Sequence, residues 1–166
     1  YTKAYSSLFT SIKNLATDPS SDDAKIALRS QIINFTNYYN GISESLKKYR
    51  NDVNTEIKAS VDEINNLTQQ IQSLNEQIFQ AELHGDEAST FRDDRDLCID
   101  RLSQLINVSV EEKEVAVKGA VYTKYVVKAD GHTLVDHLDA DQLTLKADDD
   151  GFFQIGWASG FTFNKS

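Results

Sequence analysis

The sequence predicts an α+β protein, with a long-helix antiparallel bundle or coiled coil followed by a small antiparallel β region. Stretches without glycine and proline favour helices, and glycine-punctuated stretches favour strands and turns. One glycine, Gly41, lies between the single proline, Pro19, and Gly85, and the other five of the seven glycines follow residue 115. The apolar spacing also changes to alternation near residue 108. We expect a helical bundle domain over residues 1–107 and a β domain, complete or continuing, over residues 108–166.

The first predicted helix covers residues 5–16. Its apolar residues recur at helical spacing and form one face, which includes Leu8, Ile12 and Leu15. Pro19 ends this helix, because proline disfavours a helical conformation in the residue before it. The candidate N-cap residues of the next helix are Ser20, Ser21 and Asp22.

The second predicted helix is long, covering residues 22–83. Apolar residues follow one another in steps of three and four, with two consecutive steps of four near Val53 and Ile57. This pattern is a heptad seam with one stutter. Ser60 is the weak position, and Val61 beside it can compensate. Because the seam is narrow and the other faces are polar, it must pack against another helix of this chain or of a neighbour.

The third predicted helix covers residues 89–107. Gly85 provides a helix end before it, and the short link predicts that it runs antiparallel to the end of the second helix. Leu97 or Cys98 lies on its apolar face, where the cysteine is expected to be a small buried hydrophobe. The opposite, solvent-exposed face is expected to carry Arg92, Arg95, Asp96, Asp100 and Arg101. The predicted packing residues of the bundle are Leu46, Tyr49, Val53, Ile57, Ile64, Leu67, Ile71, Leu74 and Ile78, facing Phe91, Leu97, Leu102 and Leu105.

From Val108 onward, alternating segments are separated by turn signals at Gly119, Gly131 and Gly151, two of which follow an aspartate as hairpin turns prefer. The region is rich in aromatic residues. Alternate ones are expected to form the core of the sheet, although exposed aromatic residues can also anchor partners. These residues are Tyr122, Tyr125, Phe152, Phe153, Trp157, Phe161 and Phe163.

The overall charge argues against two classes of partner. The formal net charge is -9 and the isoelectric point is about 4.7, which disfavours nucleic acid and anionic membrane surfaces. No apolar run approaches the ~18 residues of a membrane-spanning helix. A single cysteine excludes an intramolecular disulfide framework and a multi-cysteine zinc site.

We find no pattern typical of catalysis or of a cofactor site. A phosphate-binding glycine loop, a nucleophile elbow and an HExxH spacing are all missing. His132 and His137 are five residues apart in a predicted strand and hence on opposite faces, which disfavours a metal pair. The run of aspartates before Gly151 lacks the ligand spacing of a calcium loop, and Asp93, Asp94 and Asp96 scatter over an exposed helix face. We expect no catalytic, cofactor-binding or metal residues.

Four stretches resemble a known family, the flagellar hook-associated protein that forms the hook–filament junction. The first is DPSSDDAKIALRSQIINFTNYYNGISESL, an acidic, proline-started entry into a long helix. The second is VDEINNLTQQIQSLNEQI, over residues 61–78, which alone could be a generic coiled coil. DDRDLCIDRLSQLINVSV, over residues 93–110, is more specific because it follows in the expected order. GHTLVDH, over residues 131–137, is the fourth.

This resemblance implies a structural subunit of the external bacterial flagellum, exported by the flagellar type III route without a cleaved signal peptide. The implied partners are other copies of itself, neighbouring hook and junction subunits, and an export chaperone. It also implies an internal fragment that lacks both terminal helical segments of the family. From the residues alone, an extracellular adhesin with a helical stalk and an aromatic β tip is an alternative.

Overall fold

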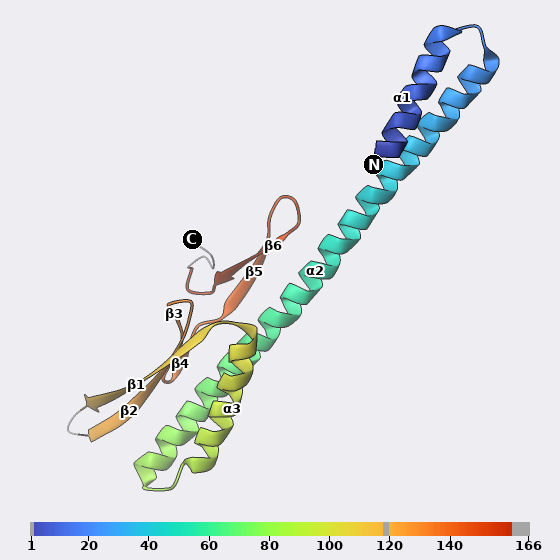
Figure 1. Ribbon diagram of the computed structural model, residues 1–166. Coiled ribbons are helices and arrows are strands. Elements are labelled where there is room, and N and C mark those ends of the chain that lie inside the picture. The colour runs from blue at the N-terminus through green and yellow to red at the C-terminus, as the bar shows by residue number, and fades with distance from the viewer. Residues whose placement is uncertain (1, 118–119, 161–166) are drawn as a thin grey trace. The chain divides into compact units, whose positions relative to one another are not determined.

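A computed structural model describes residues 2–117 and 120–160 of the chain. Over these residues the chain forms three helices and six strands, listed here in order: α1 Thr2–Thr17, α2 Asp22–His84, α3 Ser89–Leu105, β1 Val108–Val117, β2 Ala120–Ala129, β3 His132–Asp136, β4 Asp139–Ala140, β5 Leu143–Ala147 and β6 Phe153–Trp157 (Figure 1). The helices begin and end close to the predicted residues. Phe161 and Phe163, named above as β-region aromatics, and the turn signal at Gly119 lie outside the described residues.

The chain divides into two compact units between Val53 and Asn54. We call these the N-terminal unit and the C-terminal unit. The division falls inside α2 at the predicted stutter, and not at residue 107, where we expected helical and β domains to separate. The reason is that α2 after residue 54, α3 and the strands share one apolar core.

In the N-terminal unit, α1 folds back antiparallel along the first part of α2 (Figure 1). The turn around Pro19 is fixed by the Asp18 carboxylate, which accepts hydrogen bonds from the backbone N–H and hydroxyl of Ser20. Ser21 caps α2, because its Oγ accepts a 3.2 Å hydrogen bond from the N–H of Ala24.

In the C-terminal unit, α3 runs antiparallel beside the end of α2 (Figure 1). The link begins with a Schellman motif, in which Asp86 N–H donates to Ala81 O at 2.9 Å and Gly85 N–H donates to Glu82 O at 3.1 Å. Gly85 has a φ of 78°, which is unstrained only for glycine. The glycine signal in the sequence therefore predicted this helix end.

The strands form two antiparallel sheets. One has four strands in the order β1-β2-β3-β4, with an irregular register between Val127 and Lys128, and the other pairs β5 with β6. Asp130 and Gly131 both have positive φ at the tight β2–β3 turn, as the Asp-Gly signal predicts.

The core of the C-terminal unit joins helix and strand residues. Its buried members are Val61, Ile64, Leu67, Ile71, Cys98, Leu102, Tyr125, Val127, Ala129, Leu134, Val135, Leu143 and Trp157. Ile57, Leu74 and Leu105 are partly buried against it. The sheets thus cover one side of the α2–α3 pair. We expected the helices and strands to form successive domains and did not predict this shared core.

Candidate functional site

The predicted packing residues fall into three groups. Ile64, Leu67, Ile71, Ile78 and Leu102 are buried. Partly exposed positions are Val53, Ile57, Leu74, Phe91 and Leu105. The last three, Leu46, Tyr49 and Leu97, are exposed by 64%, 69% and 59% and lie outside the core that the described residues form. Val61 is buried next to partly exposed Ser60 and fills the weak position of the seam.

The exposure of these three residues within this chain has physical reasons. α1 has sixteen residues and pairs with α2 from its start, so it covers roughly the first 24 Å of α2 and ends before Leu46 and Tyr49. In α3 the buried positions are Arg95, Cys98 and Leu102, so Cys98 and not Leu97 takes the inward position. Burial raises the pKa of the Cys98 thiol, which disfavours the reactive thiolate form.

Arg95 is the main residue that sequence reasoning misplaced. We expected it on the solvent face of α3, but it is only 6% exposed. Its guanidinium carbon lies 3.5 Å from the centre of the Tyr125 ring, and its Nη1 donates to Asn75 Oδ1 at 3.1 Å. Glu112 and Asp96 each approach it to 3.9 Å. Burial lowers the pKa of Arg95 from its ordinary value, and the neighbouring Tyr125, Asp96 and Glu112 oppose that shift.

Amide side chains of α2 bind the backbone of the β region. Asn65 satisfies both backbone groups of Leu143, with Nδ2 donating to the carbonyl at 2.9 Å and Oδ1 accepting from the N–H at 2.8 Å. Asn54 binds Gly151 O and Phe153 N–H in the same manner. These amides replace a neighbouring strand, because an edge strand leaves such groups unpaired.

Two further amides extend this set of contacts towards the end of α2. Gln72 donates to Leu138 O at 2.5 Å, and Asn75 donates to His137 O at 2.9 Å. The recurrence of Asn and Gln along α2 in the sequence could have indicated that these side chains make hydrogen bonds. The identity of their backbone partners required the folded β region.

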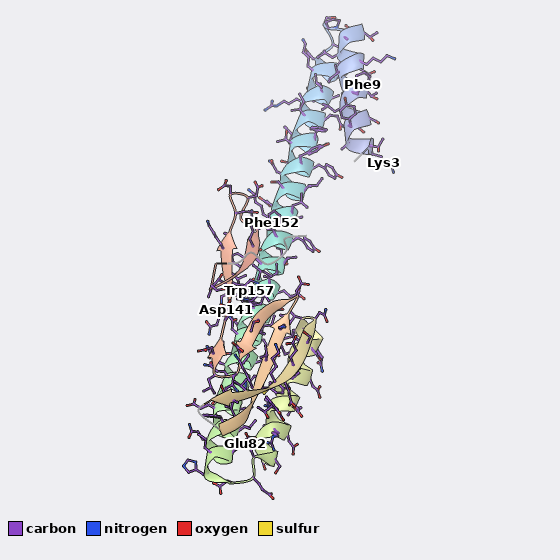
Figure 2. All side chains as sticks on the ribbon, turned by 90° about the vertical axis from the view of Figure 1, so that its left-hand side faces the viewer. Lys3, Phe9, Glu82, Asp141, Phe152 and Trp157 are labelled. Atoms are coloured by element: carbon purple, nitrogen blue, oxygen red, sulfur yellow. The ribbon has the colours of Figure 1, made fainter. Side chains whose placement is uncertain are left out.

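Asp141 is the centre of a second polar cluster. It accepts hydrogen bonds from the Ser159 hydroxyl at 2.5 Å and the Ser159 N–H, and it lies 2.7 Å from His132 Nε2. The His132 ring stacks on Trp157 at 4.2 Å, and Figure 2 shows Asp141 and Trp157 close together beside α2. Burial raises the pKa of Asp141, but the hydrogen bonds from Ser159, His132 and the Gln142 N–H outweigh it and hold the pKa below its usual value. The cluster joins Asp141, which follows β4, to Ser159, which follows β6.

The two histidines of the β region make contacts with different residues. His132 belongs to the Asp141 cluster, whereas His137 follows β3 with a φ of 60°. Among the described residues, no group of three or more His, Cys, Asp or Glu side chains could hold a metal ion. Within those same residues, no helix is both long and apolar enough to span a bilayer.

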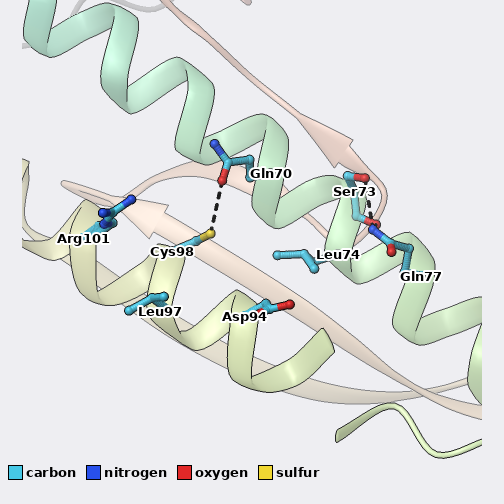
Figure 3. A pocket seen from close by; sticks show the side chains of 8 residues that line it. All are labelled: Gln70, Ser73, Leu74, Gln77, Asp94, Leu97, Cys98 and Arg101. Carbon is cyan, nitrogen blue, oxygen red and sulfur yellow. Dashed lines mark hydrogen bonds between the residues drawn. The ribbon is translucent and has the colours of Figure 1, made fainter. Parts of the chain in front are cut away.

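An open groove of about 360 Å³ lies between α2 and α3 (Figure 3). Leu74, Leu97 and Cys98 supply its apolar lining, and Cys98 Sγ approaches Gln70 Oε1 at 3.6 Å. Its remaining lining side chains are Ser73, Gln77, Asp94 and Arg101. The groove is therefore open to solvent, and five of its eight lining residues are polar.

Among the described residues, the N-terminal unit has more exposed large apolar side chains than the C-terminal unit. None of its described residues is buried. Its exposed large apolar side chains are Tyr5, Phe9, Ile12, Ile26, Ile32, Ile33, Tyr38, Leu46 and Tyr49. Figure 2 labels Phe9 on α1. We call this set the exposed apolar surface.

Among the described aromatic residues of the β region, two are buried, two (Tyr122 and Phe153) are partly buried and one is exposed. Trp157 and Tyr125 are buried, whereas Phe152 is half exposed. Tyr122 packs against Phe79 at a ring distance of 5.5 Å. This arrangement gives little support to an aromatic binding tip over the described residues.

These contacts define a structural α+β unit, in which a long helix and an antiparallel partner carry two small sheets on a common core. Residues 2–166 match the family described as the flagellar hook-associated protein FlgK helical domain, and the chain belongs to that family. The fold class and the resemblance noted in the sequence are thereby confirmed.

Individual relatives agree with this assignment. The chain is 33% identical over 137 residues to flagellar hook-associated protein 1 of Escherichia coli (strain K12), covering 81% of this chain and 24% of that protein. It is 28% identical over 141 residues to flagellar hook-associated protein 1 of Bacillus subtilis (strain 168), covering 84% and 26%. The solved flagellar hook junction protein FlgK from Burkholderia pseudomallei matches with a TM-score of 0.73 and 26% identity, over 97% of this chain and 28% of that chain. The chain spans about a quarter of the length of the curated relatives it matches.

Proposed function

We propose that the protein containing this chain is a structural, non-catalytic subunit of the bacterial flagellum that joins the hook to the filament. Membership of the FlgK helical domain family supports this, as do relatives named for the hook and its junction. Its proposed partners are other copies of itself, neighbouring hook and junction subunits, and an export chaperone. Its proposed location is outside the cell, after export without a cleaved signal peptide.

The exposed apolar surface of the N-terminal unit is the observation that carries this proposal. Helices with a solvent-exposed apolar face are stabilised when the face packs against another element. We propose that this surface contacts neighbouring subunits along and across the flagellar axis. Leu46 and Tyr49, the two seam residues of this unit that are most exposed, belong to it.

In the C-terminal unit we propose a different use for the seam. The seam residues from Ile57 to Leu74 stabilise the subunit itself, because they lie in the shared core or pack against it. Assembly and folding then depend on separate parts of α2. Substitutions can therefore distinguish the two.

The test replaces Phe9, Ile26 and Tyr49 together by serine in the full-length protein, in a flagellated strain that lacks its own copy. The matched control replaces Lys3, Lys13 and Lys48, which are also exposed, by serine. We expect the first variant to be exported into the medium without being retained in flagella, with loss of swimming. The control should swim. Normal swimming and retention of the first variant would overturn the proposal.

Light scattering of the purified 166-residue chain gives an independent readout. We expect its mass to rise with concentration less steeply for the serine variant than for the parent, because the exposed apolar surface drives association. Equal association of the two would show that this surface is not adhesive by itself.

A further inference from the structure

The ring of His137 lies in an aromatic cage between α2 and β2. It stacks on Tyr122 with a centroid distance of 5.4 Å and an interplanar angle of 29°. Phe79 of α2 meets it nearly edge to face, at 5.5 Å and 87°. Both ring nitrogens are buried, and within the described residues neither has a hydrogen-bond partner.

The backbone of the same turn is attached to α2 and β2 by hydrogen bonds. His137 N–H donates to Tyr125 O at 2.8 Å. The carbonyls of His137 and Leu138 accept from Asn75 and Gln72 of α2. Residues 136–139 therefore form a turn that is held in place by one caged ring and by the hydrogen bonds around it.

We propose that His137 is an acid-sensitive latch, which holds the β3–β4 turn on α2 while its ring is neutral and releases the turn when the ring is protonated. An imidazolium carries two N–H donors, and leaving buried charged donors without acceptors is costly. Leaving the cage lets both donors reach water. Because the ring and the two carbonyls belong to consecutive residues, its exit also strains the bonds from Asn75 and Gln72.

The charged groups around the ring act in both directions. Lys124 of β2 and Arg95 of α3 disfavour protonation, whereas Asp136 of β3 and Glu82 of α2 favour it. Burial is the largest influence, and the pKa of His137 is lowered from its ordinary value of 6.5. Favourable contact of an imidazolium with the two aromatic rings would act the other way.

The sign of the pH effect follows from this direction. In the unfolded chain the histidine has its ordinary pKa, which is higher than in the folded chain. The stabilising contribution is therefore fully present above pH 6.5 and declines as the pH falls from there through the lower folded-state pKa. For each pKa unit by which the folded-state pKa of His137 lies below the unfolded-state pKa, release of the turn becomes about tenfold more favourable at low pH.

The experiment is an NMR titration of the 166-residue chain from about pH 7.5 to about pH 5, with the chain in urea as the unfolded reference. We expect the His137 ring to titrate below the unfolded value. Exchange of the His137 amide hydrogen should become faster relative to its intrinsic rate as the ring protonates, while amides of β5 and β6 keep their protection. A folded pKa equal to or above the unfolded value would overturn the latch, and so would unchanged protection of the His137 amide.

A variant comparison tests the same mechanism without NMR assignment. His137→Phe keeps an aromatic ring in the cage but cannot be protonated, so its urea midpoint should fall less than the parent's between about pH 7.5 and about pH 5. His84→Gln, at the exposed end of α2, should behave as the parent. Equal acid sensitivity of the parent and His137→Phe would overturn the proposal. Should His137→Phe fail to fold, the titration of the parent alone still decides.

Discussion

The guanidinium of Arg95 lies on the face of the Tyr125 ring, 3.5 Å from its centre, and so joins α3 to β2 inside the C-terminal unit. Burial also raises the pKa of Tyr125, which favours the neutral phenol next to the cation. Asn75 of α2 completes the contact by accepting a hydrogen bond from Nη1. One charged side chain thus connects three elements that are far apart in the sequence.

Replacing Arg95 by alanine is expected to lower the free energy of unfolding by about 2–4 kcal/mol. The variant loses the cation–π contact and the packing of the side-chain stem, and it removes one partner of buried Asn75. Urea denaturation followed by circular dichroism measures the change. Arg92→Ala is the matched control, because Arg92 is exposed and pairs with Glu82 on the surface, where about 1 kcal/mol or less is expected. Similar losses for the two variants would contradict the role of Arg95.

The sequence predicted the helices well and the position of Arg95 badly, for related reasons. Helix ends depend on local signals such as Pro19 and Gly85, which can be read directly. The inward position of Arg95 depends on β2, which lies some thirty residues away and covers a helix face that composition marks as polar. Asn65 illustrates the same limit, because an amide that pairs with a distant backbone cannot be distinguished in sequence from one that faces water.

Asn65 is expected to be the most sensitive amide of α2. Asn65→Ala leaves both backbone groups of Leu143 without their partner, and we expect a loss of about 1–3 kcal/mol in unfolding free energy. Asn66→Ala, an exposed neighbour on the same helix, should change stability by less than about 0.5 kcal/mol. Urea denaturation of both variants makes the comparison. Faster exchange of the Leu143 amide hydrogen in Asn65→Ala would locate the defect at β5, and unchanged exchange would contradict it.

Two of the predicted packing residues, Ile71 of α2 and Leu97 of α3, have similar size but differ in exposure, so together they test the packing prediction. Ile71 is fully buried, so Ile71→Ala should cost about 2–4 kcal/mol through lost burial and the cavity that remains. Leu97 is mostly exposed on α3, so Leu97→Ala should change stability by no more than about 0.5 kcal/mol. Thermal and urea unfolding measure both. A large loss in Leu97→Ala would mean that the groove beside it closes in solution.

Glu111 provides a second pH dependence, which begins below pH 4.5. Hydrogen bonds from Lys113 at 2.8 Å and Lys128 at 2.5 Å lower its pKa from 4.5 to about 2. The folded pKa is the lower one, so the stabilising contribution of this carboxylate is present above pH 4.5 and is lost as the pH falls towards about 2. Glu111→Gln should therefore lose stability less steeply than the parent as the pH falls below 4.5. Urea midpoints measured across that range test this, with Glu114→Gln on the same strand as the control. A neutral amide cannot reproduce a contribution that depends on charge. If the urea midpoints of Glu111→Gln and the parent changed in parallel with pH, the two lysines would not bind the carboxylate in solution.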